Sequence, residues 1–283
     1  MARVICDIRC ELGEGPLWSV RENAVYWVDI LGAKLHRLSL ADNRVDSWAM
    51  PEKIGWVVER RDEPGFIAGL QSGFHVLTLS PLQCTALLDP EPDLPGNRMN
   101  DAKVDHLGRI WAGTMDCDIR EATGSLYCLD PQLGVTRQDY GYLVTNGPAF
   151  DAVRRCCYHN DTGRGIVYRF DMGPAGDLCN KREFIRFPRE WGLPDGMTVD
   201  AEGGLWIAHW DGGRVTRFLP DGEADRSVAL PVSRVTSCTF GGEKLDRLLV
   251  TTAAQDRHDE PQAGMLFELD PGVSGLPPHR FAG

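Results

Sequence analysis

One stretch of the sequence decides the fold, Arg98-Met99-Asn100-Asp101-Ala102-Lys103-Val104-Asp105-His106-Leu107-Gly108-Arg109-Ile110-Trp111-Ala112-Gly113-Thr114-Met115. Its pattern predicts a strand, a tight turn at His106-Leu107-Gly108 and a second, apolar strand of β-prone residues. Variants of this unit return along the chain, each with a polar residue where the first buried strand should begin. They open at Glu14-Gly15-Pro16, Asn146-Gly147-Pro148 and Asp195-Gly196-Met197. The repeat therefore predicts the fold, and the polar residues at its strand starts predict the site.

Two strand signals recur with a regular period. An apolar strand ending in small or polar residues is predicted at Tyr26–Ile30, Phe66–Leu70, Ile110–Thr114, Cys157–Asp161, Leu205–His209 and Leu248–Thr252, with starts 40, 44, 47, 48 and 43 residues apart. An alternating strand follows each of them, at Leu35–Leu40, Phe74–Leu79, Ser125–Leu129, Ile166–Phe170, Arg214–Leu219 and Met265–Leu269. Six strand-rich copies without a long helical period predict an all-β, six-bladed β-propeller with four-stranded antiparallel blades. A β-sandwich is the alternative, but it would not repeat six times at this spacing.

The whole chain, residues 1–283, is expected to form this single propeller domain, because no linker composition interrupts it. The opening segment, around residues 2–8, alternates like a strand. We expect it to pair into the last blade and close the ring, which removes an exposed sheet edge.

Composition limits the partners and the compartment. The net charge of −11 makes nucleic acid and anionic membrane unfavourable partners, because the electrostatic term would be repulsive. The sequence opens without a leader pattern and contains no apolar run long enough to span a membrane. The nine cysteines include no C-x-x-C pair and are predicted to be buried, reduced thiols. These features predict a cytoplasmic protein, either a monomer or a weak homo-oligomer.

The innermost strands of a propeller line its central channel. Aligning the six units by their first strand places these residues at equivalent positions: Glu14, Ile54, Asn100, Asn146, Asp195 and Ser237. Two carboxylates that converge on one axis repel each other unless a cation lies between them. A set of oxygen ligands suits hard ions such as Ca²⁺, Mg²⁺ or Mn²⁺. The pattern thus favours a divalent metal site, although the same polar residues could instead cap strand ends in a wet channel.

Several multi-residue motifs resemble one known family. They are Glu14-Gly15-Pro16-x-Trp18, Arg98-x-Asn100-Asp101, Gly108-Arg109-x-Trp111-x-Gly113-Thr114-Met115, Asn146-Gly147 and Pro194-Asp195-Gly196. In this order they resemble the SMP-30/gluconolactonase/LRE family, which includes regucalcin and bacterial sugar-acid lactonases. The resemblance covers essentially the whole chain. It is specific for the family and weak for the substrate.

The resemblance implies one divalent cation in the channel of a six-bladed propeller. Ca²⁺ is favoured, with Zn²⁺, Mg²⁺, Mn²⁺ and Fe²⁺ as alternatives. Carried over position by position, Glu14, Asn146 and Asp195 would hold the metal, while Arg98 and Asn100 would contact the substrate. Asn100 would lie near enough to help hold the metal, and Asp195 would also serve as the catalytic base.

One loop departs from the family pattern. Some members place a substrate-binding Glu in the loop that here spans residues 116–124, and the best register puts Arg120 there, with Glu121 one step away. Both are left out of the predicted site. The charged loops 115–124 and 253–264 are interpreted either as a lid over the entrance or as solvated connections.

Other residues are given structural interpretations. His159 and His209 lie at strand ends and could serve as ligands or proton shuttles, but hydrogen-bonded structural roles are favoured. The recurring tryptophans Trp18, Trp27, Trp111 and Trp206 are interpreted as packing between blades. The aspartates Asp200, Asp221 and Asp270 precede turns and are interpreted as turn residues only.

These observations predict a lactonase, which hydrolyses a sugar lactone such as glucono-, xylono- or arabinonolactone to the sugar acid. One alternative is a non-catalytic calcium-binding regulator, but an ion buffer needs no guanidinium such as Arg98 beside its metal. The other alternative is a hydrolase of a different ester or lactone, which would favour an apolar channel mouth. Asp116 and Asp118 would make this mouth polar if their loop folds inward, which would suit a polyhydroxylated ligand.

Overall fold

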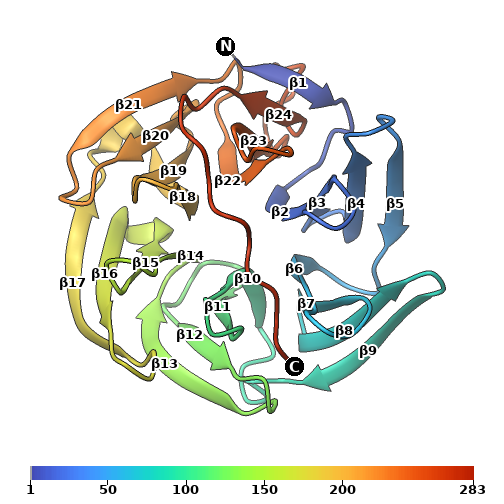
Figure 1. Ribbon diagram of the computed structural model, residues 1–283, viewed down its shortest axis with the longest axis vertical. Helices are drawn as coiled ribbons and strands as arrows, with labels where there is room; N and C mark the ends of the chain where they lie inside the picture. The colour runs from blue at the N-terminus through green and yellow to red at the C-terminus, as the bar shows by residue number, and fades with distance from the viewer. Residues whose placement is uncertain (1) are drawn as a thin grey trace.

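The computed structural model describes residues 2–283 and shows six four-stranded sheets arranged as a ring (Figure 1). The first blade consists of β2 (Gly13–Ser19), β3 (Ala24–Asp29), β4 (Lys34–Ser39) and β5 (Val45–Ala49). The second consists of β6 (Ile54–Glu59), β7 (Phe66–Leu70), β8 (Gly73–Leu79) and β9 (Leu82–Leu88). The third consists of β10 (Asn97–Val104), β11 (Ile110–Asp116), β12 (Gly124–Leu129) and β13 (Val135–Tyr142). The fourth and fifth blades are β14 (Thr145–Asp151), β15 (Cys156–Asp161), β16 (Ile166–Met172) and β17 (Leu178–Arg186); and β18 (Leu193–Val199), β19 (Leu205–Trp210), β20 (Arg214–Phe218) and β21 (Ala224–Ala229). Two short 3₁₀ helices, η1 (Thr162–Arg164) and η2 (Arg189–Trp191), lie in loops. The predicted fold class is confirmed.

The sixth blade is built from both ends of the chain. It consists of β22 (Val235–Gly241), β23 (Arg247–Thr252), β24 (Leu266–Leu269) and β1 (Arg3–Cys6). β1 pairs antiparallel with β24, with Arg3 opposite Glu268 and Val4 opposite Phe267. The predicted closure by the opening segment is therefore confirmed. Because neighbouring blades must pack in a closed circle, this pairing also fixes where the inner strands meet.

The core lies between successive blades. The side chains of Tyr26 and Val28 in the first blade pack in one cluster with Val57 and Phe66 of the second. The tryptophans Trp18, Trp27, Trp111 and Trp206 are all at most 2% exposed, as their predicted packing role requires. All nine cysteines are free thiols, but Cys84 and Cys117 are half-buried and Cys179 is exposed, so the prediction of burial is wrong for these three. Within residues 2–283 no helix is both long and apolar enough to cross a bilayer.

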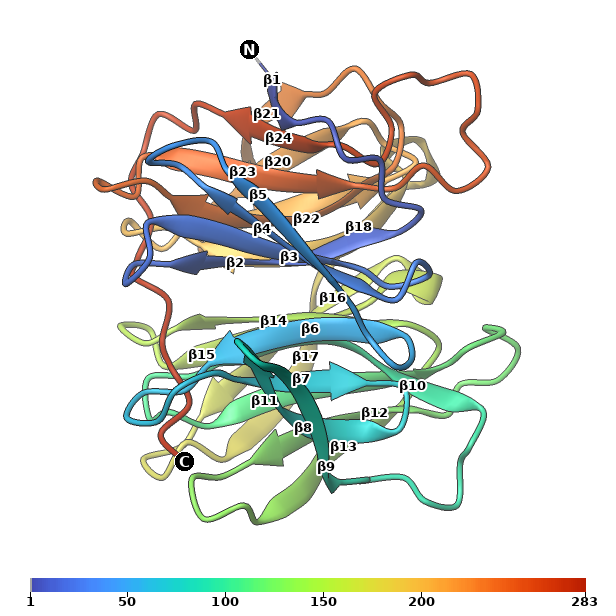
Figure 2. The same cartoon turned by 90° about the vertical axis from the view of Figure 1, so that its right-hand side faces the viewer.

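The C-terminal segment after β24 crosses the central opening (Figure 1) and runs along one face of the ring (Figure 2). It forms isolated bridges from Gly275 to Asp200 and from Phe281 to Arg60, so it ties the fifth blade to the second. Phe281 is fully buried in the cluster that also contains Trp56 and Ile110. One end of the channel is thus covered by the chain itself.

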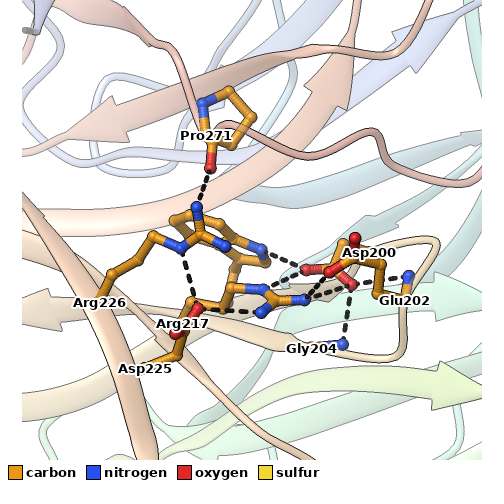
Figure 3. Close-up of polar contacts among 8 residues, drawn as sticks. Asp200, Glu202, Gly204, Arg217, Asp225, Arg226 and Pro271 are labelled. Carbon is orange, nitrogen blue, oxygen red and sulfur yellow. Dashed lines mark hydrogen bonds and ion pairs between the residues drawn. The ribbon is translucent and has the colours of Figure 1, made fainter.

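Asp200 anchors a buried polar network in the fifth blade (Figure 3). Its Oδ2 accepts hydrogen bonds from Trp206 Nε1 at 2.9 Å and from Arg217 Nε at 2.7 Å, while Oδ1 accepts from Gly204 N at 2.8 Å. Burial opposes ionisation, but the hydrogen bonds from Arg217 and Trp206 outweigh it and lower the pKa of Asp200. The interpretation of Asp200 as a turn residue only is therefore wrong, because it is also half of a buried ion pair with Arg217.

The other two turn aspartates behave as predicted. Asp221 Oδ1 accepts from Glu223 N and Asp270 Oδ1 accepts from Gly272 N. The third blade repeats the Asp200 arrangement, since Asp105 Oδ2 accepts from both Trp111 Nε1 and Arg109 Nε at 2.8 Å.

Asp200→Ala should destabilise the protein by about 3–5 kcal/mol, because it leaves the buried Arg217 guanidinium without its main partner. Asp171→Ala is the matched control, since Asp171 pairs with Arg182 where both side chains are about 40% exposed; it should cost no more than about 1 kcal/mol. Urea unfolding of both variants measures the difference. Equal losses would show that the Asp200 network adds no more stability than a surface pair.

Candidate active site

Every inner strand that carries a predicted site residue is irregular near that position. The pairing registers of β2, β10, β14 and β18 shift between Glu14 and Leu17, Met99 and Ala102, Asn146 and Ala149, and Pro194 and Met197. Such bulges bend a strand and redirect a side chain. Gly15 and Gly147 adopt φ of +52° and +80° at these points, a conformation that favours glycine. The glycines that follow Glu14 and Asn146 in sequence are thus explained by the backbone turn that presents these two side chains.

The predicted site residues all line one cavity of about 290 Å³. Six polar side chains of the lining come from four different blades and are at most 7% exposed: Glu14, Arg98, Asn100, Asn146, Thr162 and Asp195. Glu14 lies on β2, Asn100 on β10, Asn146 on β14 and Asp195 on β18. The structure therefore brings together all five residues named from the sequence. Their individual roles stay predictions.

A chain of hydrogen bonds connects these side chains across the blades. Arg98 Nη1 donates to Asn100 Oδ1 at 2.6 Å, and Asn100 Nδ2 donates to Asn146 Oδ1 at 3.1 Å. Asn146 Nδ2 donates to Thr162 Oγ1 at 2.9 Å, and Thr162 Oγ1 donates to the Pro194 carbonyl at 2.7 Å. Each amide is held by a partner on both sides. Consequently Asn146 presents its oxygen, with one lone pair still available, toward the Asn100 side of the cavity.

Sequence reasoning assigned no role to Thr162, which lines the cavity, or to Asp101, which supports the bulge at Asn146. Thr162 begins η1, just after β15, and its role depends on contacts with the next blade that no local pattern reveals. Asp101 is 1% exposed and its Oδ2 accepts from Gly147 N at 3.0 Å. It thereby ties β10 to the bulge that presents Asn146. Its place beside Asn100 in the Arg98-x-Asn100-Asp101 motif was the available signal.

The buried carboxylates repel each other. Burial, followed by the charge of Asp101, raises the pKa of Glu14 to about 8. Burial, followed by the charges of Glu14 and Asp101, raises the pKa of Asp195 well above its usual range. Arg98 moderates both shifts, but burial also lowers the pKa of its own guanidinium. Without a cation the site therefore disfavours two ionised carboxylates, and a bound cation would favour both.

This donor set fits a hard divalent cation. Glu14 and Asp195 supply two negative charges and Asn146 a neutral oxygen, all from side chains lining the same cavity. Within residues 2–283 no group of three or more His, Cys, Asp or Glu side chains could hold a metal ion. A cation at this site would therefore depend on the amide oxygen of Asn146 as well as on the two carboxylates.

The two histidines weighed as ligands or proton shuttles lie outside the cavity lining. Both are fully buried, and burial lowers the pKa of His159 to about 3 and that of His209 to about 4. His209 has the expected hydrogen bond, from Nδ1 to the Trp191 carbonyl at 2.8 Å. For His159 that expectation is wrong. Among the described residues neither ring nitrogen has a partner, and the ring packs edge-on against Tyr142 at 4.9 Å.

Both loops interpreted as a lid contribute to the cavity lining, residues 115–124 through Met115 and Ile119 and residues 253–264 through Gln255. Asp116 and Asp118 do not line the cavity, so the prediction that they make its mouth polar is wrong. Arg120 and Glu121 are exposed and also absent from the lining, which supports leaving them out of the site.

His159→Phe should remove a pH dependence of stability. The folded pKa of about 3 lies below the ordinary value of about 6.5, so below pH 6.5 the unfolded state binds a proton that the folded state does not. The stability that the neutral, buried His159 side chain contributes is complete above about pH 6.5 and is lost as pH falls toward 3. Between pH 7 and pH 5 the free energy of unfolding should fall by about 2 kcal/mol less in the variant than in the wild type. Urea unfolding at both pH values measures this. The matched control is His258→Phe at an exposed position, which should behave like the wild type. If the unfolding free energy of His159→Phe changed with pH as much as that of the wild type, the assignment would be contradicted.

Comparison with known proteins finds relatives across nearly the whole chain. The family model of the SMP-30/Gluconolactonase/LRE-like region matches residues 12–254. A 6-deoxy-6-sulfogluconolactonase of Pseudomonas putida is 35% identical over 278 residues, covering 96% of this chain and 95% of that protein. Regucalcin of Gallus gallus is 35% identical over 288 residues, covering 97% and 96%. The crystal structure of a calcium-binding protein, regucalcin, from Agrobacterium tumefaciens superposes with a TM-score of 0.92 at 28% identity, covering 100% of this chain and 97% of that one.

Proposed function

Because this chain belongs to the SMP-30/gluconolactonase/LRE-like family, we propose that it is a lactonase that hydrolyses a sugar lactone to the sugar acid with the help of one divalent cation. The observation that carries the proposal is the cavity lined by two buried carboxylates, Glu14 and Asp195, and by the hydrogen-bonded set Arg98, Asn100 and Asn146. Glu14, Asn146 and Asp195 would hold the cation, and Ca²⁺ suits their oxygen donors best. When bound, it would supply Lewis acidity that polarises the lactone carbonyl and offsets the charge that develops on its oxygen.

Arg98 and Asn100 would position the substrate. Within residues 2–283 the hydrogen bonds of the Arg98 side chain both come from Nη1, to Met99 O at 3.0 Å and to Asn100 Oδ1 at 2.6 Å. Its Nε and Nη2 therefore remain for ring hydroxyls. Because Asn100 is fixed on both sides, little conformational entropy is lost when a substrate binds against it.

Asp195 would act as the general base. Its carboxylate would accept a proton from a water molecule as that water attacks the lactone carbonyl carbon. The ring C–O bond would then break, and the proton would pass to the leaving alkoxide to give the hydroxy acid. Its position supports this role, because the Asp195 side chain lines the cavity and is 4% exposed. A bound cation would oppose the rise in pKa that burial and the Glu14 charge cause, so the base assignment rests on this position.

A second candidate function is the hydrolysis of a different lactone or ester. The mouth of the cavity favours this second function, because apolar side chains line much of it. They are Leu12, Ile119, Val144, Leu193 and Trp210. A panel of sugar lactones and simple esters, assayed by acid release above the spontaneous rate, separates the two functions.

Chelation should abolish lactone hydrolysis, and added divalent cation should restore it. Glu14→Gln should weaken cation binding at least tenfold, because it removes one of two negative charges while keeping the side chain's shape. Titration calorimetry with Ca²⁺ and Mn²⁺ measures the affinity. The matched control is Glu22→Gln, whose carboxylate pairs with Arg37 outside the cavity; it should bind like the wild type. Wild-type activity in chelator, together with unchanged cation binding by Glu14→Gln, would contradict the metal assignment.

Asp195→Asn separates the two roles of this residue, because the amide keeps an oxygen ligand and loses the base. With cation shown to be bound at saturation, kcat should remain about 10²–10⁴-fold below that of the wild type. Turnover close to the wild-type value under the same conditions would mean that Asp195 is a ligand only.

A further inference from the structure

The cavity is divided by polarity. Its floor is the polar set described above, and these side chains are almost completely buried. Toward solvent the lining becomes mainly apolar, with Leu12, Val144 and Trp210 half-buried and Ile119 and Leu193 exposed by 52% and 36%. Its polar members there are the half-buried Arg234 and Gln255. A ligand whose reacting group lies on the floor must therefore place its far end against hydrocarbon.

Ile119 is held at the mouth in an unfavourable backbone conformation. Its φ is +55°, in the left-handed region that β-branched residues rarely adopt. The loop imposes this conformation, because the Asp116 carboxylate accepts N–H hydrogen bonds from Arg120 at 2.8 Å and from Asp118 and Glu121 at 3.2 Å. The Cys117 N–H is also fixed, by the Gly96 carbonyl at 3.0 Å. Unfavourable conformations that persist in a loop held by its own hydrogen bonds are concentrated at ligand contacts.

The charged side chains of the same loop are directed elsewhere. Asp118 and Arg120 pair with each other at 3.4 Å, are 61% and 79% exposed, and do not line the cavity. On the other side of the mouth Arg234 is engaged by its own chain. Its guanidinium lies 4.6 Å from the Trp210 ring centre and donates to Asp211 Oδ1 at 3.3 Å and to the Gln255 carbonyl. The charged groups around the mouth are thus occupied by partners within the chain, and the Gln255 side-chain amide is the polar group that the mouth offers to a ligand.

We propose that Ile119 determines specificity, and that the preferred substrate is a lactone whose exocyclic end is apolar, a methyl or other alkyl group rather than a hydroxymethyl or an anion. This inference rests on the proposed lactonase function and adds the substrate class. A hydroxyl placed against Ile119, Leu193 and Val144 loses water without gaining a hydrogen-bond partner. A methyl group at the same place gains apolar contact.

The test compares two substrates that differ by one oxygen atom, arabinono-1,4-lactone and its 5-deoxy analogue. For the wild type with saturating Ca²⁺, kcat/KM should be about tenfold or more higher for the deoxy lactone. Ile119→Asn keeps a residue that tolerates positive φ and replaces the apolar surface, so it should lower this ratio severalfold. Ile119→Leu, which retains an apolar side chain, is the matched control and should keep the preference.

Equal kcat/KM for the two lactones in the wild type, or a ratio unchanged by Ile119→Asn, would overturn the inference while leaving the lactonase function intact. Faster hydrolysis of a lactone with a terminal carboxylate, such as glucaro-1,4-lactone, would also overturn it, since Arg234 would then recognise the exocyclic end. Failure to hydrolyse any of the lactones would overturn the proposed function and this inference with it.

Discussion

The buried carboxylates of Glu14 and Asp195 repel each other, and the propeller must hold both at one cavity. One lies on the first blade and the other on the fifth, and closure of the ring through β1 and β24 brings both to one cavity. Two like charges away from water are unfavourable unless a cation lies between them or one becomes protonated. A propeller suits this arrangement, because packing between all six blades stabilises the ring and fixes the position of each inner strand. The free energy of folding can thus hold charges together that would otherwise separate, and a metal ion can recover much of that cost on binding.

The remaining features keep the oxygen donors in place. Bulges redirect the inner strands, and the hydrogen bonds from Arg98 through Asn100, Asn146 and Thr162 to the Pro194 carbonyl link three blades. The C-terminal segment covers one face of the ring, and the cavity mouth lies between loops that carry Ile119 and Gln255. Under the proposed function, strands would carry the reacting groups, while loops would recognise the substrate's exocyclic end.

Sequence reasoning worked where the information is periodic. The repeat of about 45 residues predicted the blades, and alignment of their first strands was enough to place Glu14, Asn100, Asn146 and Asp195 around one channel. It failed where a residue's role depends on contacts between blades or on the path of a loop. Thr162 acts through the next blade, Asp200 reaches Arg217 on a different strand, and Ile119 occupies the mouth where Asp116 and Asp118 were expected. The hydrogen bond expected for His159 is likewise absent among the described residues, where its ring instead packs against the aromatic ring of Tyr142.

A crystal structure of the protein soaked with Mn²⁺, with anomalous data collected to locate the ion, tests most directly whether Glu14, Asn146 and Asp195 hold a cation. We expect one strong anomalous peak per chain in the central cavity, with oxygens of these three side chains at about 2.0–2.6 Å. In the same experiment Glu14→Gln should show a weaker peak at equal Mn²⁺ concentration. A peak elsewhere, or none in the cavity at a concentration that supports full activity, would contradict the assignment of these three residues as the metal ligands.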